Sequence, residues 1–151
     1  MTKTLFKLMT VAVLSTALFS CEKGENTDPT NDSQSNEGRV YILNEGVWGG
    51  NDAELSRYST ADNSIANDYF ASKNGRGLGD VANDIEIYGG KMYVVVNCSN
   101  TVEVIDSKTG NSIQQIPLSG KQPREVAFYE GYAYVSCYDK TVVKIDTATL
   151  S

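Results

Sequence analysis

The sequence predicts an all-β fold made of β-propeller blades, each a four-stranded antiparallel sheet, and a repeat in its second half is the main reason. Residues 81–93 read VANDIEIYGGKMY and residues 122–134 read QPREVAFYEGYAY, so that Tyr, Gly and Tyr recur at a shift of 41 (134 − 93). After one deleted residue, Thr-Val and Ile-Asp in residues 101–106 recur in residues 141–146, at a shift of 40 (146 − 106). Short β-type runs separated by turns at this period are typical of one blade per repeat.

The first 20 residues read as a signal peptide. Lys3 and Lys7 give a basic start, and an apolar run extends from Leu5 to Phe19. The apolar core of this run is too short to span a bilayer with margin and ends in small residues, which favours cleavage over a membrane helix.

Cys21 stands where cleavage is expected. The sequence Leu18-Phe19-Ser20-Cys21 resembles the lipobox of bacterial lipoproteins, although Phe at the second position is bulkier than usual. The resemblance implies that Cys21 is acylated and becomes the mature amino terminus, which would anchor the protein to the outer membrane. The alternative is a chance Cys after the apolar run.

Residues 21–38 are expected to form the lipidated Cys and a disordered acidic tether. Residues 22–38 contain five acids, one lysine and no aromatic or aliphatic side chain, so they cannot bury enough apolar surface to fold. A flexible coil of this length would hold the next domain roughly 20 to 25 Å from the lipid. Acids after such a Cys also resemble the signal that exports lipoproteins to the surface of Bacteroidetes-type bacteria, but a plain spacer explains the composition equally well.

The charge of the chain argues against nucleic-acid binding. The formal net charge is −6 (13 − 19), and removal of residues 1–20 with their two lysines makes it −8 (11 − 19). Nucleic acid and anionic membrane surfaces should repel such a chain.

Residues 39–151 are expected to form a partial β-propeller, and its first blade begins at Val40–Asn44. Alignment on the repeat gives Tyr41 the place of Tyr93, so this run should be the second strand of a blade that lacks its first. Leu55–Ser59 follows as the next strand after a ten-residue insertion, EGVWGGNDAE. A second insertion, residues 72–80, should link this blade to the next.

The second blade is the most complete. Ile85 and Ile87 alternate with polar residues in its first strand, and Met92–Val96 is apolar throughout, as expected of a strand covered on both faces. Thr101–Ile105 and Ser112–Leu118 complete the sheet, in which Pro117 suits a strand with a free edge. The Asp, Thr and Gly between the last two runs are turn residues.

The third blade repeats this order at Val126–Tyr129, Tyr132–Cys137 and Thr141–Ile145. The total is about two and a half blades, whereas a closed ring needs roughly four to eight. We therefore expect an amino-terminal piece of a longer propeller, with helical folding or dimeric closure as less favoured alternatives.

The residue types do not favour an enzyme. The chain has no His, which removes the commonest general base, the Ser-His-Asp triad and most zinc or iron ligand sets. Asp52, Asp80 and Asp84 have no paired spacing and read as loop residues. The Gly-rich runs lack the Lys and strand-to-helix context of a phosphate loop. No catalytic residue, metal site or cofactor is predicted.

Cys98 and Cys137 lie near equivalent ends of the second strand in adjacent blades, and an exported protein would permit their pairing. Cys137 belongs to the strand whereas Cys98 falls in the following turn, so their separation is not fixed by the repeat. A buried thiol is the alternative for Cys137, and the pairing stays open.

One rim of the propeller is the predicted ligand site. Loops between second and third strands and connections between blades emerge on the same face, where propellers usually bind ligands. Trp48 lies in an inserted loop and does not recur, so packing within a blade does not explain it. Asn83 and Arg124 are repeat partners at the start of the innermost strands. The expected rim residues are Trp48, Asn51, Asp52, Arg76, Asn83, Asn97, Lys121, Arg124 and Tyr138.

The phrase PREVAFYEGYAYVSCYDKTVVKIDTAT resembles YncE-like, YVTN-type propeller repeats. The phrases LNEGVWGGNDAELSRYS and LGDVANDIEIYGGKMYVVVNCSNTVEVID look like surface lipoproteins of gut Bacteroidetes-type bacteria, a group that includes the BtuG family. That resemblance covers about residues 39–151 and implies a propeller of about seven blades. BtuG proteins capture cobalamin for a TonB-dependent outer-membrane transporter, but relatives with the same phrases have no known ligand.

These features predict a lipid-anchored surface propeller that binds a nutrient, with a cobamide as the first ligand to test. The alternatives are a protein-interaction or scaffold propeller at the cell surface and a propeller enzyme of the lactonase or lyase type. The absence of His lowers the last alternative.

Overall fold

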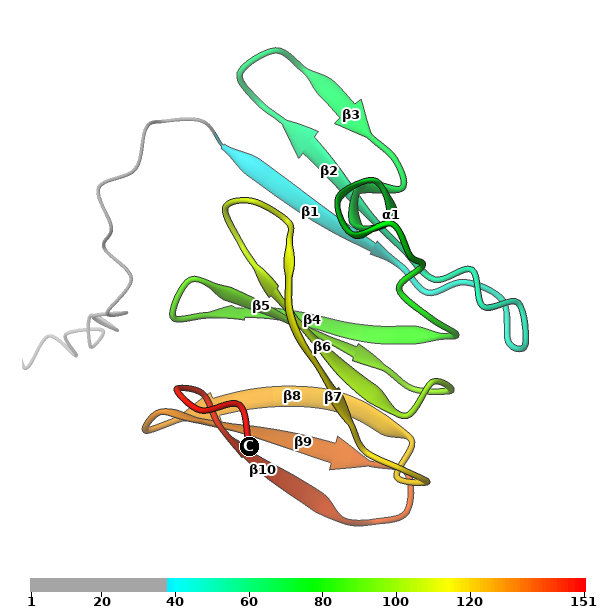
Figure 1. Cartoon of the computed structure of the whole chain (residues 1–151), viewed down its shortest axis with the longest axis vertical. Coiled ribbons are helices and arrows are strands. Elements are labelled where there is room, and N and C mark those ends of the chain that lie inside the picture. The colour runs from blue at the N-terminus through cyan, green and yellow to red at the C-terminus, as the bar shows by residue number, and fades with distance from the viewer. Residues whose placement is uncertain (1–37) are drawn as a thin grey trace, which may run out of the picture.

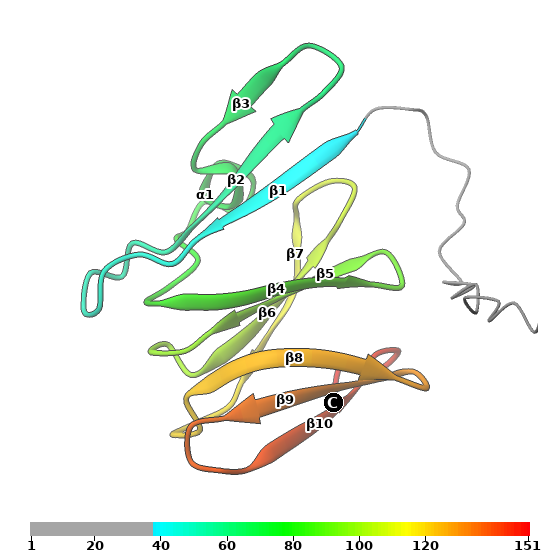
Figure 2. The same cartoon turned by 180° about the vertical axis from the view of Figure 1, so that it is seen from behind.

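A computed structural model describes residues 38–151, so the predicted signal peptide, Cys21 and nearly all of the predicted tether lie outside the described residues. Three antiparallel sheets stack on one another (Figure 1, Figure 2). Each strand pairs with its neighbour in sequence, which confirms the all-β prediction. The sheets are β1 (Arg39–Asn44), β2 (Glu54–Ser59) and β3 (Ser64–Ala66); β4 (Ala82–Tyr88), β5 (Lys91–Val96), β6 (Thr101–Asp106) and β7 (Ser112–Pro117); and β8 (Pro123–Tyr129), β9 (Tyr132–Cys137) and β10 (Val142–Asp146).

The middle sheet is packed on both faces. Along β5, Tyr93 and Val95 belong to the core shared with the third sheet. Met92, Val94 and Val96 belong to a second core shared with the first sheet. Successive side chains of a strand point to opposite faces, and here both faces are apolar because each meets another sheet. Full burial of one such side chain contributes about 1.5 to 3 kcal/mol to stability.

The first sheet has the incomplete form that the repeat predicts. β1 contacts β4 across the boundary between two sheets, as β5 contacts β8. β1 therefore occupies the place of a second blade strand, in agreement with the alignment of Tyr41 with Tyr93. Within residues 38–151 no strand pairs with the other edge of β1, and Val40 and Ile42 are exposed there.

The backbone repeats as well as the sequence. β4 has a bulge between Ala82 and Asp84, and β8 has one between Pro123 and Glu125, so Asn83 and Arg124 are the extra residues of equivalent bulges. Val81, with a φ of 57°, precedes the first bulge as Gln122, with a φ of 48°, precedes the second. A β-branched residue rarely adopts positive φ, so the strand entrance is strained at Val81.

The predicted turn chemistry is present. The Asp106 Oδ1 atom accepts hydrogen bonds from the backbone N–H groups of Lys108 and Thr109. Asp146 makes the same two bonds to residues 148 and 149 in the next repeat. Pro117 ends β7, the outermost strand of its sheet. Proline has no N–H to donate, and at the free edge no neighbouring strand requires one.

The link between the first two sheets contains a short helix that the sequence analysis did not predict. α1 spans Tyr69–Asn74 and ends at Gly75, whose φ is 66° and whose N–H donates to the carbonyl of Ala71. Its first residues, Tyr69 and Phe70, are buried between the sheets. A helix of six residues is too short to show a hydrophobic period.

Within residues 38–151, no helix has the length and apolar character needed to cross a membrane.

Candidate functional site

The loops predicted to form one rim lie together. Residues 45–53, 97–100, 118–122 and 138–141 all lie at the right-hand side of Figure 1 and the left-hand side of Figure 2. Backbone hydrogen bonds join neighbouring segments, because Asn97 N–H donates to the Val81 carbonyl and Tyr138 N–H donates to the Gln122 carbonyl. We call this end of the sheets the rim.

Trp48 projects from the rim on a loop that is held by two carboxylates. The Asp52 Oδ1 atom accepts a 2.8 Å hydrogen bond from Val47 N–H. Both oxygens of Asp80 accept from Gly49 N–H, at 3.0 and 3.1 Å. Trp48 is nevertheless 82% exposed. Asp52 and Asp80 therefore fix the loop, and Trp48 is displayed on a fixed backbone.

Gly46 is required at the base of this loop. Its φ is 82°, and a Cβ there would lie 2.7 Å from both the backbone N of Ala53 and a carboxylate oxygen of Asp52. A larger residue would displace the segment that carries Trp48.

Cys98 lies beside Trp48 and Asp80. Burial raises the pKa of the Cys98 thiol, the negative charge of Asp80 raises it further, and a hydrogen bond with the Trp48 side chain opposes this rise. Cys98 and Cys137 are both unpaired thiols, so the pairing that the sequence left open is absent. Cys137 is buried in the core of the third sheet, as the alternative predicted.

The two bulge residues use their side chains differently. Asn83 Nδ2 donates a 2.9 Å hydrogen bond to Glu45 Oε1, while its buried Oδ1 atom has no partner. Arg124 is exposed. Bulges re-aim side chains at strand ends, so the same backbone position presents an amide in one sheet and a guanidinium in the next.

Two other predicted rim residues are structural or paired. Asn97 is 8% exposed and donates a 2.9 Å hydrogen bond from Nδ2 to the Pro123 carbonyl, so it joins two sheets instead of facing a ligand. Lys121 Nζ lies 3.2 Å from Asp139 Oδ2. Tyr138, in contrast, is 72% exposed.

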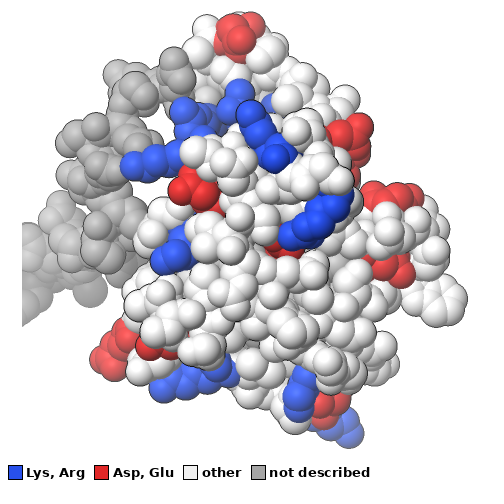
Figure 3. Space-filling view, in the orientation of Figure 1, with Lys and Arg blue, Asp and Glu red and all other residues white. Residues whose placement is uncertain are grey.

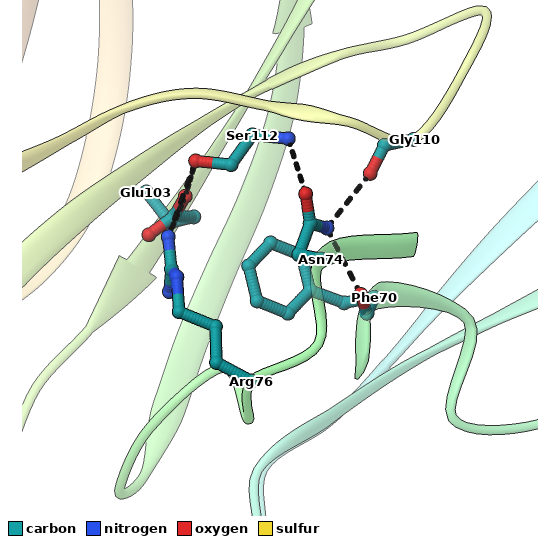
Figure 4. Close-up of polar contacts among 6 residues, drawn as sticks. All are labelled: Phe70, Asn74, Arg76, Glu103, Gly110 and Ser112. Carbon is teal, nitrogen blue, oxygen red and sulfur yellow. Dashed lines mark hydrogen bonds and ion pairs between the residues drawn. The ribbon is translucent and has the colours of Figure 1, made fainter. Parts of the chain in front are cut away.

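Arg76 does not join the rim. Its Nη2 atom lies 2.7 Å from Oε1 of Glu103, a completely buried residue of β6, and 3.1 Å from the Ser112 hydroxyl (Figure 4). Its guanidinium also covers the ring of Phe70 at 5.0 Å. The prediction that Arg76 contacts a ligand at the rim is therefore wrong in placement, because burial of Glu103 demands a positive partner.

A pocket of about 380 Å³ opens beside the Trp48 loop. Its polar wall includes Asn51 and Asp52 from the loop, with Glu54 and Asp68. The buried apolar side chains of Leu55, Phe70 and Leu78 line its inner part. The sequence analysis expected Asn51 and Asp52 at the rim but predicted no pocket, because α1 and its flanks supply the other wall.

Glu54 and Asp68 interact directly. Glu54 Oε1 accepts a 2.6 Å hydrogen bond from the backbone N–H of Asp68 and a 3.0 Å bond from the Ser56 hydroxyl. The bond from the Asp68 backbone is the main cause that lowers the pKa of Glu54. The hydrogen bond and negative charge of the Glu54 side chain raise the pKa of Asp68. Asp68 thus holds its proton more readily than an ordinary Asp, whereas Glu54 remains an acceptor.

The family comparison covers the same residues as the three sheets. Residues 38–151 match the model described as Domain of unknown function (DUF5074). The chain belongs to this family. No curated protein matches the chain. The DUF5074 domain therefore contains both the rim and the pocket.

This DUF5074 domain places polar and apolar groups side by side at the pocket. Carboxylate and amide oxygens in the pocket accept hydrogen bonds from N–H and O–H groups, and Trp48 offers an apolar plane beside them. Among the described residues, no group of three or more Cys, Asp or Glu could hold a metal ion.

Proposed function

We propose that this chain is a lipid-anchored propeller on the outer membrane that binds a nutrient ligand, with a cobamide as the first candidate. Capture at the surface would deliver the ligand to a TonB-dependent outer-membrane transporter. The lipobox at Cys21, the acidic stretch after it and the resemblance to YncE-like and BtuG propellers support anchorage and ligand class.

The observation that carries the proposal is the position of an exposed aromatic residue and a pocket on one fixed loop. Trp48 stands on the loop whose residues Asn51 and Asp52 line the pocket. A cobamide combines a broad flat ring with amide arms. The indole suits the ring, and the oxygen acceptors suit the amide N–H groups. A pocket of about 380 Å³ accepts one part of such a molecule while the remainder lies over the rim.

Calorimetric titration with cyanocobalamin tests this function. The full mature protein should bind, and Trp48→Ala should weaken affinity by about 30-fold if the indole is a binding anchor. Tyr129→Ala is a matched control, because Tyr129 is also an exposed aromatic residue but ends β8 at the opposite end of the sheet. Absence of heat at micromolar concentrations would reject the cobamide.

A protein-interaction role is the second candidate, and Val47 supports it. This side chain is exposed next to Trp48, so the loop presents two adjacent large apolar groups. Such a projection also suits an anchor in a protein interface. Recovery of a transporter with the immobilised protein, together with no binding of small ligands, would favour this role.

A further inference from the structure

We propose that a basic surface around Tyr69 docks this domain on the anionic headgroups of the membrane that carries its anchor. We call it the Tyr69 face and define it by Arg39, Arg57, Lys73, Arg76 and Lys108. The proposal rests on the lipid anchorage of the proposed function, but it adds a contact surface.

Two cations converge on the ring of Tyr69. The guanidinium carbon of Arg57 lies 5.0 Å from the ring centroid, and the Lys73 ammonium lies 5.7 Å from it. Arg57 reaches this point because it pairs with Tyr41 across β1 and β2, and the Tyr41 ring lies 6.0 Å from that of Tyr69. Lys73 follows Tyr69 by four residues on α1, which places both on one side of the helix.

Arg57 and Lys73 have no carboxylate partner within residues 38–151. Arg76, in contrast, forms an ion pair with Glu103. Arg39 Nη1 donates a 3.2 Å hydrogen bond to the Lys108 carbonyl, which brings the start of β1 to the turn after β6. The nearby Asp106 carboxylate accepts hydrogen bonds from the N–H groups of its own turn, and the positive charge of Lys108 also helps to lower its pKa. Arg57 and Lys73 hold like charges over one ring and repel each other, and an external anion would relieve that repulsion.

The domain as a whole has a negative net charge, although this face is basic. Residues 38–151 carry ten basic and fourteen acidic side chains, a formal net charge of −4 (10 − 14). In Figure 3 several Lys and Arg side chains lie on the upper front part of the surface, with an acidic group among them, whereas Asp and Glu dominate its right-hand edge. The sequence therefore predicts repulsion from anionic membranes, but the arrangement of the charges creates one surface that attracts them.

The chain enters the domain beside this face. Arg39 is the first residue of β1, and the predicted tether between it and Cys21 has 17 residues (38 − 22 + 1). Anchorage at Cys21 would keep the face within roughly 20 to 25 Å of the lipid, at a high effective concentration. Arg39 lies at the opposite end of β1 from the rim loops, whereas α1 lies closer to them and its residues Phe70 and Ala71 line the pocket beside the Trp48 loop (Figure 1).

Co-sedimentation with vesicles tests the proposal without the anchor. The protein is the whole mature chain, residues 21–151, with Cys21→Ala so that no acyl chain contributes. Vesicles of phosphatidylcholine are compared with vesicles that also contain phosphatidylglycerol, at low and high salt. We expect binding to the anionic vesicles alone and loss of binding at high salt.

Matched variants locate the contact. Arg57→Gln with Lys73→Gln should weaken binding roughly 25-fold, since each basic side chain near such a surface contributes roughly fivefold. Lys91→Gln with Lys144→Gln changes the net charge equally at β5 and β10, outside both the Tyr69 face and the rim, and should have little effect. Arg57→Lys keeps the charge and should retain binding. Circular dichroism would confirm that each variant remains folded.

Three outcomes would overturn docking: no binding to anionic vesicles, equal losses in both double variants, or binding of inorganic phosphate at the face without vesicle binding. The last result would indicate a site for a soluble anion. Cyanocobalamin titration of the same variants separates this proposal from the function, because loss of docking leaves rim binding intact. Conversely, absence of acylation at Cys21 in cells would reject the anchored function while vesicle binding could persist.

Discussion

The guanidinium of Arg76 and the carboxylate of Glu103 form a 2.7 Å ion pair in which Glu103 is completely buried and Arg76 is partly exposed. The pair joins the segment after α1 to the centre of β6, and the Ser112 hydroxyl donates to the same carboxylate oxygen. It therefore ties the link between the first two sheets to the middle sheet (Figure 4).

Arg76→Met should destabilise the domain by about 2 to 4 kcal/mol, because it leaves a buried carboxylate without its cation. The partly exposed position of Arg76 places this value below that of a fully buried pair. Urea denaturation provides the measurement. Lys121→Met, which breaks the more exposed Lys121–Asp139 pair, should cost less than about 1 kcal/mol. Equal losses in the two variants would contradict the structural role of the buried pair.

Leu55→Ala should destabilise the domain by about 2 to 5 kcal/mol, because Leu55 is fully buried in the core between the first and middle sheets. Ile65→Ala on β3 is the matched control, since Ile65 is largely exposed and should change stability by about 0.5 kcal/mol or less. Thermal denaturation of both variants tests whether the first sheet packs as described. If Leu55→Ala left the melting temperature unchanged, the first sheet would not pack as described.

Acid should weaken the domain partly through Asp106. Hydrogen bonds from Thr109, chiefly from its backbone N–H, lower the pKa of Asp106 below its ordinary value of 3.8. A carboxyl group with a lower pKa when folded contributes stability above the unfolded pKa, and this contribution disappears as the pH falls through the folded pKa. Asp106→Asn should therefore flatten the decrease of urea midpoint between about pH 5 and pH 2. Identical slopes for variant and parent would refute this explanation.

Cys98 and Cys137 should remain reduced and react slowly with iodoacetamide at neutral pH. Burial raises the pKa of both thiols, so little thiolate is present there. Mass spectrometry of the Cys21→Ala protein, with and without urea, measures the labelling of each thiol. Unfolding should accelerate both reactions. A disulfide in protein prepared without reductant would contradict the structure.

Asp52→Ala should loosen the Trp48 loop without unfolding the domain. The change removes the acceptor for Val47 N–H, whereas Asp80 still holds Gly49. Trp48 is the only Trp of the chain, so its fluorescence anisotropy reports the loop and should decrease. Asp62→Ala in the β2–β3 turn should leave the anisotropy unchanged. Stability should change by less than about 1 kcal/mol in both variants.

The repeat predicted the fold well because it records constraints that recur in every sheet. Tyr93, the apolar run of β5 and the Asp106 turn could be placed from the sequence, since each has a period or a turn signature. The gathering of the loops of residues 45–53 and 138–141 at one rim also followed from strand order.

The features that the sequence did not predict depend on contacts between distant segments. Arg76 lies in a Gly-rich run that reads as an open loop, and its partner Glu103 lies 27 residues away in an apolar strand. Asn97 resembles an exposed turn residue until the Pro123 carbonyl of the next sheet is placed beside it. The pocket requires α1, whose six residues carry no periodic signal.

The bulges at Asn83 and Arg124 have a consequence for how the surface of such a domain could diversify. Equivalent backbone kinks hold an amide in one repeat and a guanidinium in the next, so the chain tolerates different chemistry at this position. Evolution could exchange these side chains one repeat at a time without disturbing the hydrogen-bond ladders beneath them. Related domains could then share one scaffold and present different side chains at its rim.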